Sequence, residues 1–296
     1  TGRSRRGRRG SRRRSSGILA EAQPAFDKEA WAEKKMAERR AVYELADSTA
    51  DVIRQDGEKF REYLDIQAKF DRYSVTNALL IQAQMPEATR LKSFDGWKET
   101  GASIRKNAKG ISILEPGDEY RREDGSVGTS WQVKKVFDIS ATTAKKQAEP
   151  LPMDGRQLLK ALIHKSPVPI QTAEKMPEGS GSYYDHDQQV IFVRKGMEAS
   201  EVFCYLAKEL SHAEIAMRAP GYNRKEADFQ AYSASYLLCK KYGVDTSRYV
   251  FTALPSRIRG QNPQAFRETL SGIRDTAAAI SGRMYRALEP KQERGR

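Results

Sequence analysis

The sequence predicts an α+β protein in two domains, in which a helical N-terminal segment leads into a small antiparallel sheet and a second α+β domain follows. At 296 residues the chain exceeds the usual size of a single hydrophobic core. Apolar residues recur at helical spacing up to about residue 84 and at strand-like spacing from residue 111. A segment rich in Lys, Gln, Glu and Pro, residues 144–154, indicates a linker with its boundary near Pro150. The expected parts are a tail at 1–22, domains at 23–148 and 149–288, and a charged end at 289–296.

Helices come first in the first domain. The spacing predicts helices over residues 23–57, 58–71 and 75–84, and Pro86 ends the third. Two β-rich runs follow at 111–116 and 131–139, and the acidic, glycine-containing segment 117–128 between them predicts a hairpin loop.

The second domain is predicted to begin with a helix at 155–164. Short strands are expected at 168–171 and 189–193, separated by turn-forming Gly, Ser and Asp residues. Helices are expected at 199–217 and 224–242, with a break at Pro220, and a last helix at 263–288.

Most of the net charge of +13 lies in the first residues of the chain. Residues 1–16 contain eight arginines and no acidic residue, so the remaining 280 residues carry only the other five excess charges. A segment of Arg, Gly and Ser cannot bury enough apolar surface to fold, and we expect it to be disordered. It is either a sequence-independent phosphate-binding arm or a spacer. The chain begins with Thr1, which leaves open that it is a fragment.

Several classes of protein are disfavoured. No run of about 18 apolar residues is present, and the apolar segment after Gly17 is too short for a signal peptide, so we expect a cytoplasmic protein without a membrane partner. The two cysteines, Cys204 and Cys239, stand among apolar neighbours in helical patterns and are expected to be buried free thiols. Two cysteines alone cannot form a four-thiolate metal site.

Aromatic, amide and basic side chains alternate in the first domain between residues 72 and 137. Single-stranded nucleic acid needs such a mixture, because every base offers a face for stacking and every linkage carries a charge. The alternative is that the aromatic residues form core and that the lysines lie in solvated turns. The residues expected to contact DNA are Arg72, Tyr73, Ser74, Asn77, Gln84, Thr89, Trp97, Lys98, Arg105, Lys106, Lys109 and Phe137.

The same region resembles the N-terminal domain of ArdC-type antirestriction proteins over roughly residues 45–145. The resemblance is carried by Tyr73-Ser74, Asn77, Leu80-Ile81, Gln84, Ala88-Thr89, Phe94 with Trp97, the turn 106–110, and the runs 111–116 and 136–139. One departure is Ala141, where the family often has Gln. The resemblance implies a module that binds single-stranded DNA without sequence preference, of the kind encoded on conjugative or other mobile elements.

A broken zinc motif stands at residues 208–212. A zinc peptidase motif needs two histidines four residues apart on one helix face, with a glutamate after the first as general base. Here Glu209 and His212 are in register, but Lys208 occupies the place of the first histidine. With three histidines in the chain, His164, His186 and His212, no intact HExxH motif is present.

The second half also resembles the zincin-like domain of the ArdC-type proteins, through Tyr183 to Asp185, Val190 to Val193 and the segments around residues 209 and 226. The resemblance implies that a glutamate at or near Glu226 would supply the third ligand, so that His212 and Glu226 remain and one ligand is lost. We therefore expect no bound zinc and no catalysis, with Glu209 a relict general base. The Lys208 ammonium either pairs with Glu226 or Glu209 in place of the metal, or points to solvent. Zinc is expected only if another ligand such as His186 rescues the site, and the turn around His186 favours a surface position.

Three functions are compatible with these patterns. The favoured one is a single-stranded DNA-binding protein of antirestriction type with an inactive metallopeptidase-like domain. The alternatives are an interaction protein whose zincin-like half binds a restriction, nuclease or conjugation protein, and a metallopeptidase with an atypical ligand set. The sequence leaves the oligomeric state open.

Overall fold

The computed structural model describes residues 27–122, 124–145, 153–177 and 179–289. The chain divides into two compact units, residues 1–37 and 38–296. The described part of the first unit is the beginning of α1 (Lys28–Gln55), where the Asp27 carboxylate accepts hydrogen bonds at 3.0 Å from the N–H groups of Glu29 and Ala30. The predicted tail at 1–22, the boundary near Pro150 and residues 290–296 of the predicted charged end lie outside the described residues.

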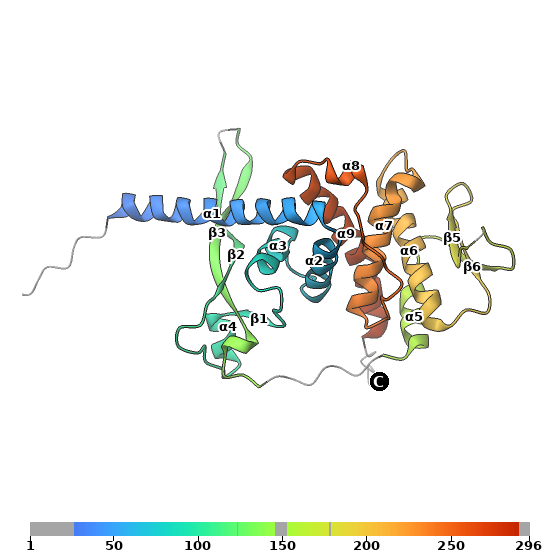
Figure 1. Cartoon of the computed structure of the whole chain (residues 1–296), viewed down its shortest axis with the longest axis horizontal. Coiled ribbons are helices and arrows are strands. Elements are labelled where there is room, and N and C mark those ends of the chain that lie inside the picture. The colour runs from blue at the N-terminus through green and yellow to red at the C-terminus, as the bar shows by residue number, and fades with distance from the viewer. Residues whose placement is uncertain (1–26, 123, 146–152, 178, 290–296) are drawn as a thin grey trace, which may run out of the picture. The chain divides into compact units, whose positions relative to one another are not determined.

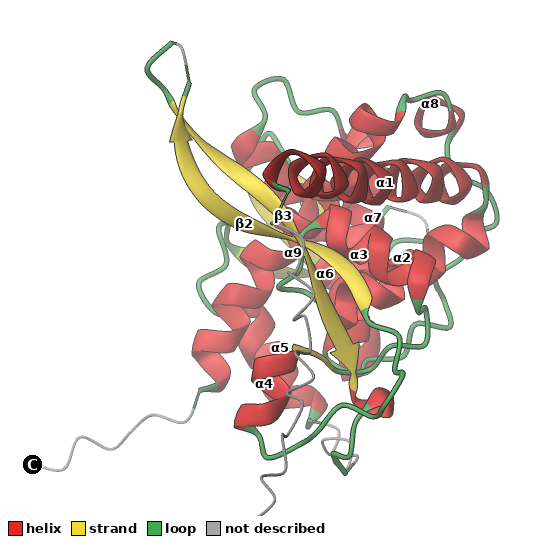
Figure 2. Ribbon diagram, turned by 90° about the vertical axis from the view of Figure 1, so that its left-hand side faces the viewer, coloured by secondary structure: helices red, strands yellow, loops and turns green. Residues whose placement is uncertain are grey.

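The predicted α+β class is confirmed, and the second unit begins with helices followed by a sheet (Figure 1). After α1 come α2 (Gly57–Lys69), whose N-terminus is capped by Asp56, and α3 (Val75–Gln84), which is capped by Ser74. The antiparallel sheet has the order β1-β3-β2, with β1 at Leu91–Ser93, β2 at Ile111–Arg121 and β3 at Val127–Asp138. The β2–β3 hairpin is long and twisted, and α3 packs against β2 (Figure 2).

The hairpin is longer than the sequence predicted. Most of the expected loop at 117–128 continues the two strands, after a register shift between Pro116 and Glu119. The Tyr120 ring lies over Gly128, where an added Cβ would come within 2.7 Å of the ring. The sequence did not predict β1, the short helix α4 (Phe94–Glu99) or the 3-10 turn η1 (Ile139–Ala141), because each is too short to show a period.

The second half contains a smaller sheet packed on helices. It comprises α5 (Gly155–Ile163), β4 (Ile170–Ala173), β5 (Ser182–Asp185), β6 (Val190–Arg194), α6 (Ala199–Arg218), α7 (Arg224–Lys241), α8 (Ser256–Arg259) and α9 (Pro263–Leu288). The strand order is β4-β6-β5, with β4 parallel and β5 antiparallel to β6, so β5 is an end strand. The sequence did not predict β5 or α8. Among the described helices, none combines the length and apolar character needed to cross a membrane.

One hydrophobic cluster draws on residues from both sides of residue 150. Phe60 on α2 has its ring centroid 5.2 Å from that of Phe229 on α7 and 5.4 Å from that of Phe251. Gly57 lies so close to the later segment that a Cβ there would come within 1.5 Å of the Phe251 carbonyl oxygen. The halves that the sequence suggested as separate domains therefore share a core.

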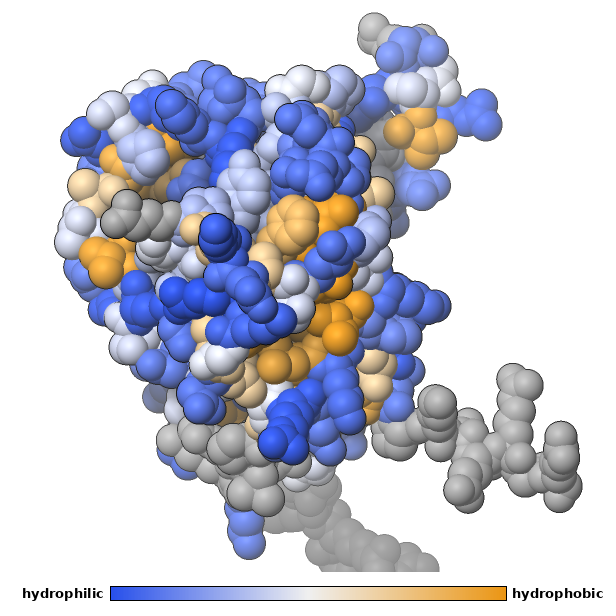
Figure 3. All heavy atoms as spheres, turned by 90° about the vertical axis from the view of Figure 1, so that its right-hand side faces the viewer, coloured by the Kyte–Doolittle hydropathy of each residue, from blue (hydrophilic) through white to orange (hydrophobic). Residues whose placement is uncertain are grey.

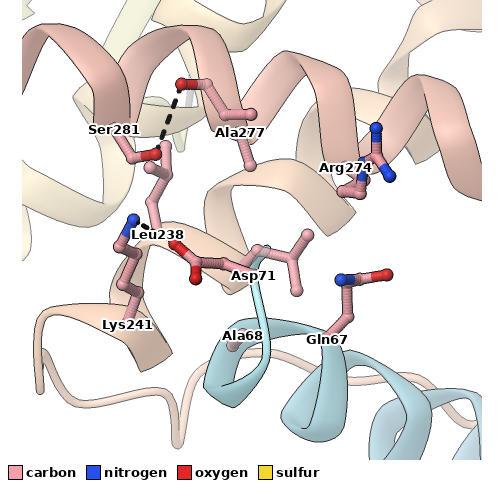
Figure 4. Close-up of a pocket in the computed structure, with 10 residues that line it drawn as sticks. Gln67, Ala68, Asp71, Leu238, Lys241, Arg274, Ala277 and Ser281 are labelled. Carbon is pink, nitrogen blue, oxygen red and sulfur yellow. Dashed lines mark hydrogen bonds and ion pairs between the residues drawn. The ribbon is translucent and has the colours of Figure 1, made fainter. Parts of the chain in front are cut away.

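Ion pairs and a hydrogen bond also join the two halves, near a small pocket that α2, α7 and α9 surround (Figure 4). Lys241 Nζ lies 2.6 Å from Asp71 Oδ2 at its edge, and Lys240 Nζ lies 3.0 Å from Asp65 Oδ1. The Tyr236 hydroxyl also donates to Asp65 at 2.6 Å.

Two amide side chains of α3 bind the outer edge of β2. The Asn77 amide donates to the Leu114 carbonyl and accepts from the Leu114 N–H, both at 2.8 Å. Gln84 makes the same pair of bonds with Ser112, at 2.9 and 2.8 Å. Because β2 is an end strand, these amides occupy backbone groups that another strand would otherwise bind.

We predict that Asn77→Ala destabilises the protein by roughly 2–4 kcal/mol, because both buried backbone groups of Leu114 lose their partners. Urea denaturation followed by tryptophan fluorescence measures the change. As a control, Gln132→Ala on an exposed position of β3 is expected to stay within about 0.5 kcal/mol of wild type. An Asn77→Ala variant as stable as this control would contradict the assigned role.

Candidate functional site: the Lys208–His212 cluster and a basic sheet face

The residues of the broken motif lie where α6 and α7 face each other. Lys208 and His212 are one turn apart on α6, and both approach Asp228 on α7. Lys208 Nζ lies 2.7 Å from Asp228 Oδ1. His212 Nε2 lies 3.4 Å from the same oxygen, longer than a good hydrogen bond. An ammonium group thus lies against the carboxylate that faces the remaining histidine.

His212 is fully buried, and burial lowers the pKa of its ring below the usual value. Its Nδ1 lies 2.9 Å from the Tyr222 hydroxyl, and burial raises the pKa of Tyr222 to about 12, which keeps that hydroxyl protonated at neutral pH. The tautomer that suits both neighbours accepts a hydrogen bond from Tyr222 at Nδ1 and carries its proton on Nε2, toward Asp228. In that tautomer Nε2 has no lone pair for a metal.

Glu209 is committed to other partners. Both of its carboxylate oxygens lie 2.8 Å from Arg224 Nη2, and Oε2 accepts a hydrogen bond of 2.7 Å from the Tyr184 N–H on β5. The Tyr184 carbonyl accepts from Arg224 at 3.4 Å. The Glu209–Arg224 pair therefore neutralises the relict base and occupies the backbone of the end strand β5 at Tyr184.

Glu226 does not lie at this site. Its side chain is exposed, while its N–H donates to Asn223 at the helix cap and its carbonyl accepts from Arg257. Residues two apart on a helix point about 200° apart, so Glu226 and Asp228 cannot share a face. The resemblance implied a third ligand at or near Glu226, and in the structure Asp228, two residues later, is the carboxylate that lies beside His212. The position of each residue around the axis of α7 could have distinguished Asp228 from Glu226.

The side chains present do not fit a catalytic metal. Zinc centres of enzymes use three protein ligands and a water, whereas this centre offers His212 and Asp228 with an ammonium between α6 and α7. Within the described ranges, no group of three or more His, Cys, Asp or Glu side chains could hold a metal ion. His186 lies in the β5–β6 turn, and its ring centroid is 4.9 Å from that of Tyr222.

Several residues that the sequence assigned to DNA contact serve the fold instead. Asn77 and Gln84 bind β2, and the Ser74 hydroxyl caps α3. Trp97 is 2% exposed, and its indole N–H donates to the Phe137 carbonyl at 2.8 Å. The Trp97 ring cannot stack on a base without leaving its buried position. The sequence showed their spacing but not the backbone that they face.

Asp138 is a buried residue that sequence reasoning did not single out. Its carboxylate accepts hydrogen bonds from the backbone N–H groups of Thr89 at 2.7 Å, Arg90 at 2.8 Å and Ser140 at 2.9 Å. Burial opposes the charge, but these hydrogen bonds hold the pKa of Asp138 below its usual value. Thr89 therefore anchors the loop before β1 to the sheet.

The remaining predicted contacts are accessible. Arg72, Lys98, Arg105, Lys106 and Lys109 are exposed, and Tyr73 and Phe137 are half-buried. Tyr73 packs edge-on against Phe70, with the ring centroids 6.0 Å apart.

We call Phe137, the sheet lysines Lys92 and Lys135 and the turn residue Lys109 the basic sheet face. Lys92 on β1 pairs in register with Phe137 on β3, and its ammonium lies 5.5 Å from the Trp97 ring centroid. Lys135 Nζ lies 3.4 Å from the Gly110 carbonyl, which holds the turn that carries Lys109 against the sheet. An added Cβ at Gly110 would come within 3.0 Å of the Phe137 ring, so this turn packs tightly on it. Phe137 thus has Lys92 and Lys135 as neighbours on the sheet, and Lys109 precedes the glycine that packs on its ring.

Comparison with known proteins gives matches to both halves. Residues 48–151 match the family model of the N-terminal domain of anti-restriction factor ArdC. An uncharacterized protein of Bacillus anthracis is 23% identical over 287 residues, which cover 75% of this chain and 47% of that protein. The chain thus spans about half the length of this curated relative.

Two crystal structures of the antirestriction protein ArdC from plasmid R388 are similar in fold. The Mn(II)-bound form has a TM-score of 0.52 and 16% identity, over 72% of this chain and 85% of that chain. The metal-free form has a TM-score of 0.49 and the same identity, over 72% and 86%. The likeness to the Mn(II)-bound form extends past residue 151, since it covers more of the chain than the family model does.

Proposed function

We propose that this chain is an ArdC-type protein that binds single-stranded DNA without catalysing peptide hydrolysis. The match of residues 48–151 to the ArdC N-terminal domain and the fold shared with ArdC of plasmid R388 support this proposal. Its role is DNA protection of antirestriction type for a plasmid or another mobile element. The first half binds the DNA strand. The second half is a metallopeptidase-like domain that no longer hydrolyses peptides.

The observation that carries DNA binding is the basic sheet face. This face combines three positive charges, from Lys92, Lys109 and Lys135, with the aromatic ring of Phe137. The ammonium groups can bind phosphates while a base contacts the Phe137 ring. Lysines bind phosphates as point charges and do not read base identity, so the arrangement favours binding without sequence preference. The Arg-rich residues 1–16 add a sequence-independent attraction.

The loss of catalysis is supported by the Lys208–Asp228 and Glu209–Arg224 pairs. The first places an ammonium against a carboxylate that a metal would need, and the second neutralises the carboxylate that would act as general base. The Mn(II) of the related structure belongs to that protein, and the donor set here departs from a metal site at Lys208.

A second candidate function is the binding of a partner protein by the second half. The side of the molecule that carries β5 and β6 shows apolar side chains in patches between charged ones (Figure 3). Such patches favour a protein interface. Titration of the chain with labelled oligonucleotides distinguishes this function from DNA binding.

We predict that the triple variant Lys92→Ala, Lys109→Ala, Lys135→Ala binds labelled single-stranded oligonucleotides more weakly. The slope of log affinity against log salt is negative, and each lost phosphate contact reduces its magnitude by about 0.7. The slope of the triple variant should therefore be shallower by roughly 2. Fluorescence anisotropy across a salt series measures both values. Lys195→Ala, an exposed lysine after β6 that pairs with Glu174, is the control and should leave binding unchanged.

The same titration uses the chain without residues 1–17 and duplexes of the same length. A preference for single strands that survives this deletion supports the proposal. If the deletion abolishes all binding, and the triple variant binds as the wild type does, the sheet face is not the DNA site and the partner-binding function is favoured.

For the second half, we predict that the purified chain retains neither zinc nor manganese after incubation with the metal and gel filtration. Lys208→His should retain about one zinc per chain, since it would complete three ligands with His212 and Asp228. Lys208→Gln, which removes the charge without adding a strong ligand, is the matched control and should bind none. Elemental analysis giving stoichiometric metal in the wild type would refute the proposed loss of the centre.

A further inference from the structure

The two cysteines of the chain face each other between α6 and α7, although they are 35 residues apart in sequence. Cys204 lies on α6 and Cys239 on α7, and their sulfur atoms are 3.5 Å apart. Both are free thiols. A disulfide requires the sulfurs to approach to about 2.05 Å, which small side-chain rotations on two adjacent helices can supply.

The two thiols differ in access. Cys204 is 6% exposed and lines a pocket of ≈ 230 Å³ together with Ser200, Glu201, Asp245 and Arg248. Cys239 is fully buried behind it, with its sulfur 3.3 Å from the Tyr249 hydroxyl. A small molecule that enters the pocket therefore meets Cys204 first.

The charges around the pair also distinguish the thiols. A hydrogen bond from the Cys239 thiol, aided by the Arg248 guanidinium and opposed by burial, lowers the pKa of Cys204 to about 7. The same contact with Cys204, together with burial, raises the pKa of Cys239. Glu201 and Asp245 also line the pocket, but the Asp245 carboxylate is bound to the Ser247 hydroxyl at 2.7 Å.

The geometry points to a modification site in which a hydroperoxide oxidises Cys204 and Cys239 then resolves it to a disulfide. The Cys204 thiolate attacks one peroxide oxygen, the O–O bond breaks, and the departing hydroxide takes a proton to leave as water, which gives a sulfenic acid. The Cys239 sulfur then attacks the Cys204 sulfur, the S–O bond breaks, and a second water leaves with the Cys239 proton. Two thiols are oxidised by two electrons, and one hydrogen peroxide is reduced to two waters.

The disulfide would tie α6 to α7, the same two helices that carry Lys208 and Asp228. It closes a loop of about 35 residues, for which a rise in the Tm of several degrees is expected. The site is independent of DNA binding and of the metal question, so its test does not depend on either.

The test uses the full chain and hydrogen peroxide at pH 7. Intact-mass spectrometry should show a loss of about 2 Da, with loss of both alkylatable thiols, and dithiothreitol should restore both. Because the chain has only two cysteines, the thiol count is unambiguous. Peroxide that oxidises methionines while both thiols remain reactive would overturn the inference.

Single variants assign the roles. Cys239→Ser should stop at the sulfenic acid of Cys204, which dimedone traps, whereas Cys204→Ser should give neither adduct nor disulfide. Arg248→Gln keeps both thiols and should slow alkylation of Cys204 at pH 7 several-fold while moving its pH midpoint upward. Dimedone labelling of Cys239 in Cys204→Ser, or an unchanged pH midpoint in Arg248→Gln, would contradict the assigned order.

Discussion

The ion pair between Lys208 and Asp228 joins α6 to α7. Lys208 Nζ lies 2.7 Å from Asp228 Oδ1 and 5.7 Å from the Tyr232 ring centroid, so the ammonium has an anionic and an aromatic neighbour. His212 and Lys208 together hold the pKa of Asp228 well below its usual value. Removing the ammonium would leave a carboxylate beside a buried imidazole without its closest counter-charge.

The surrounding contacts are consistent with this arrangement. Glu209 is paired with Arg224, and the two together occupy the backbone of Tyr184 on β5. Peptides commonly bind proteins by adding a strand to an open sheet edge, and here side chains fill that edge at Tyr184. Lys208 and Arg224 therefore neutralise the carboxylates of Asp228 and Glu209, and Glu209 also occupies the backbone N–H of Tyr184.

The sequence predicted the long helices well, because apolar periodicity over many residues determines both type and extent. The bounds of α3 and α9 agree with prediction, and α6 and α7 differ by one residue at the end. The short elements β1 and β5 were missed, because their pairing depends on distant strands such as β3 and β6. The core shared by the two halves was also not predictable, because a polar linker does not indicate whether the segments before and after it pack against each other.

The candidate sites show the same division. Lys208 in the position of a ligand could be identified from residue spacing alone, but its partner Asp228 required the phase of α7. Asn77 and Gln84 have the spacing of a binding face, yet they bind the edge of β2, because a pattern of polar residues does not reveal whether DNA or backbone lies opposite.

The Lys208 ammonium lies against Asp228, which also faces His212, and we propose that it takes the place of a metal ion. The most direct measurement is an NMR pH titration of His212, assigned with His164→Gln and His186→Gln variants. Burial lowers the pKa of His212, the positive charges of Arg224 and Lys208 lower it further, and Asp228 and Glu209 raise it. We predict that the pKa of His212 lies below the usual 6.5. It should rise in Lys208→Met, which loses a positive charge, and fall further in Asp228→Asn, which loses a negative one. A His212 pKa that does not change in Lys208→Met would contradict it.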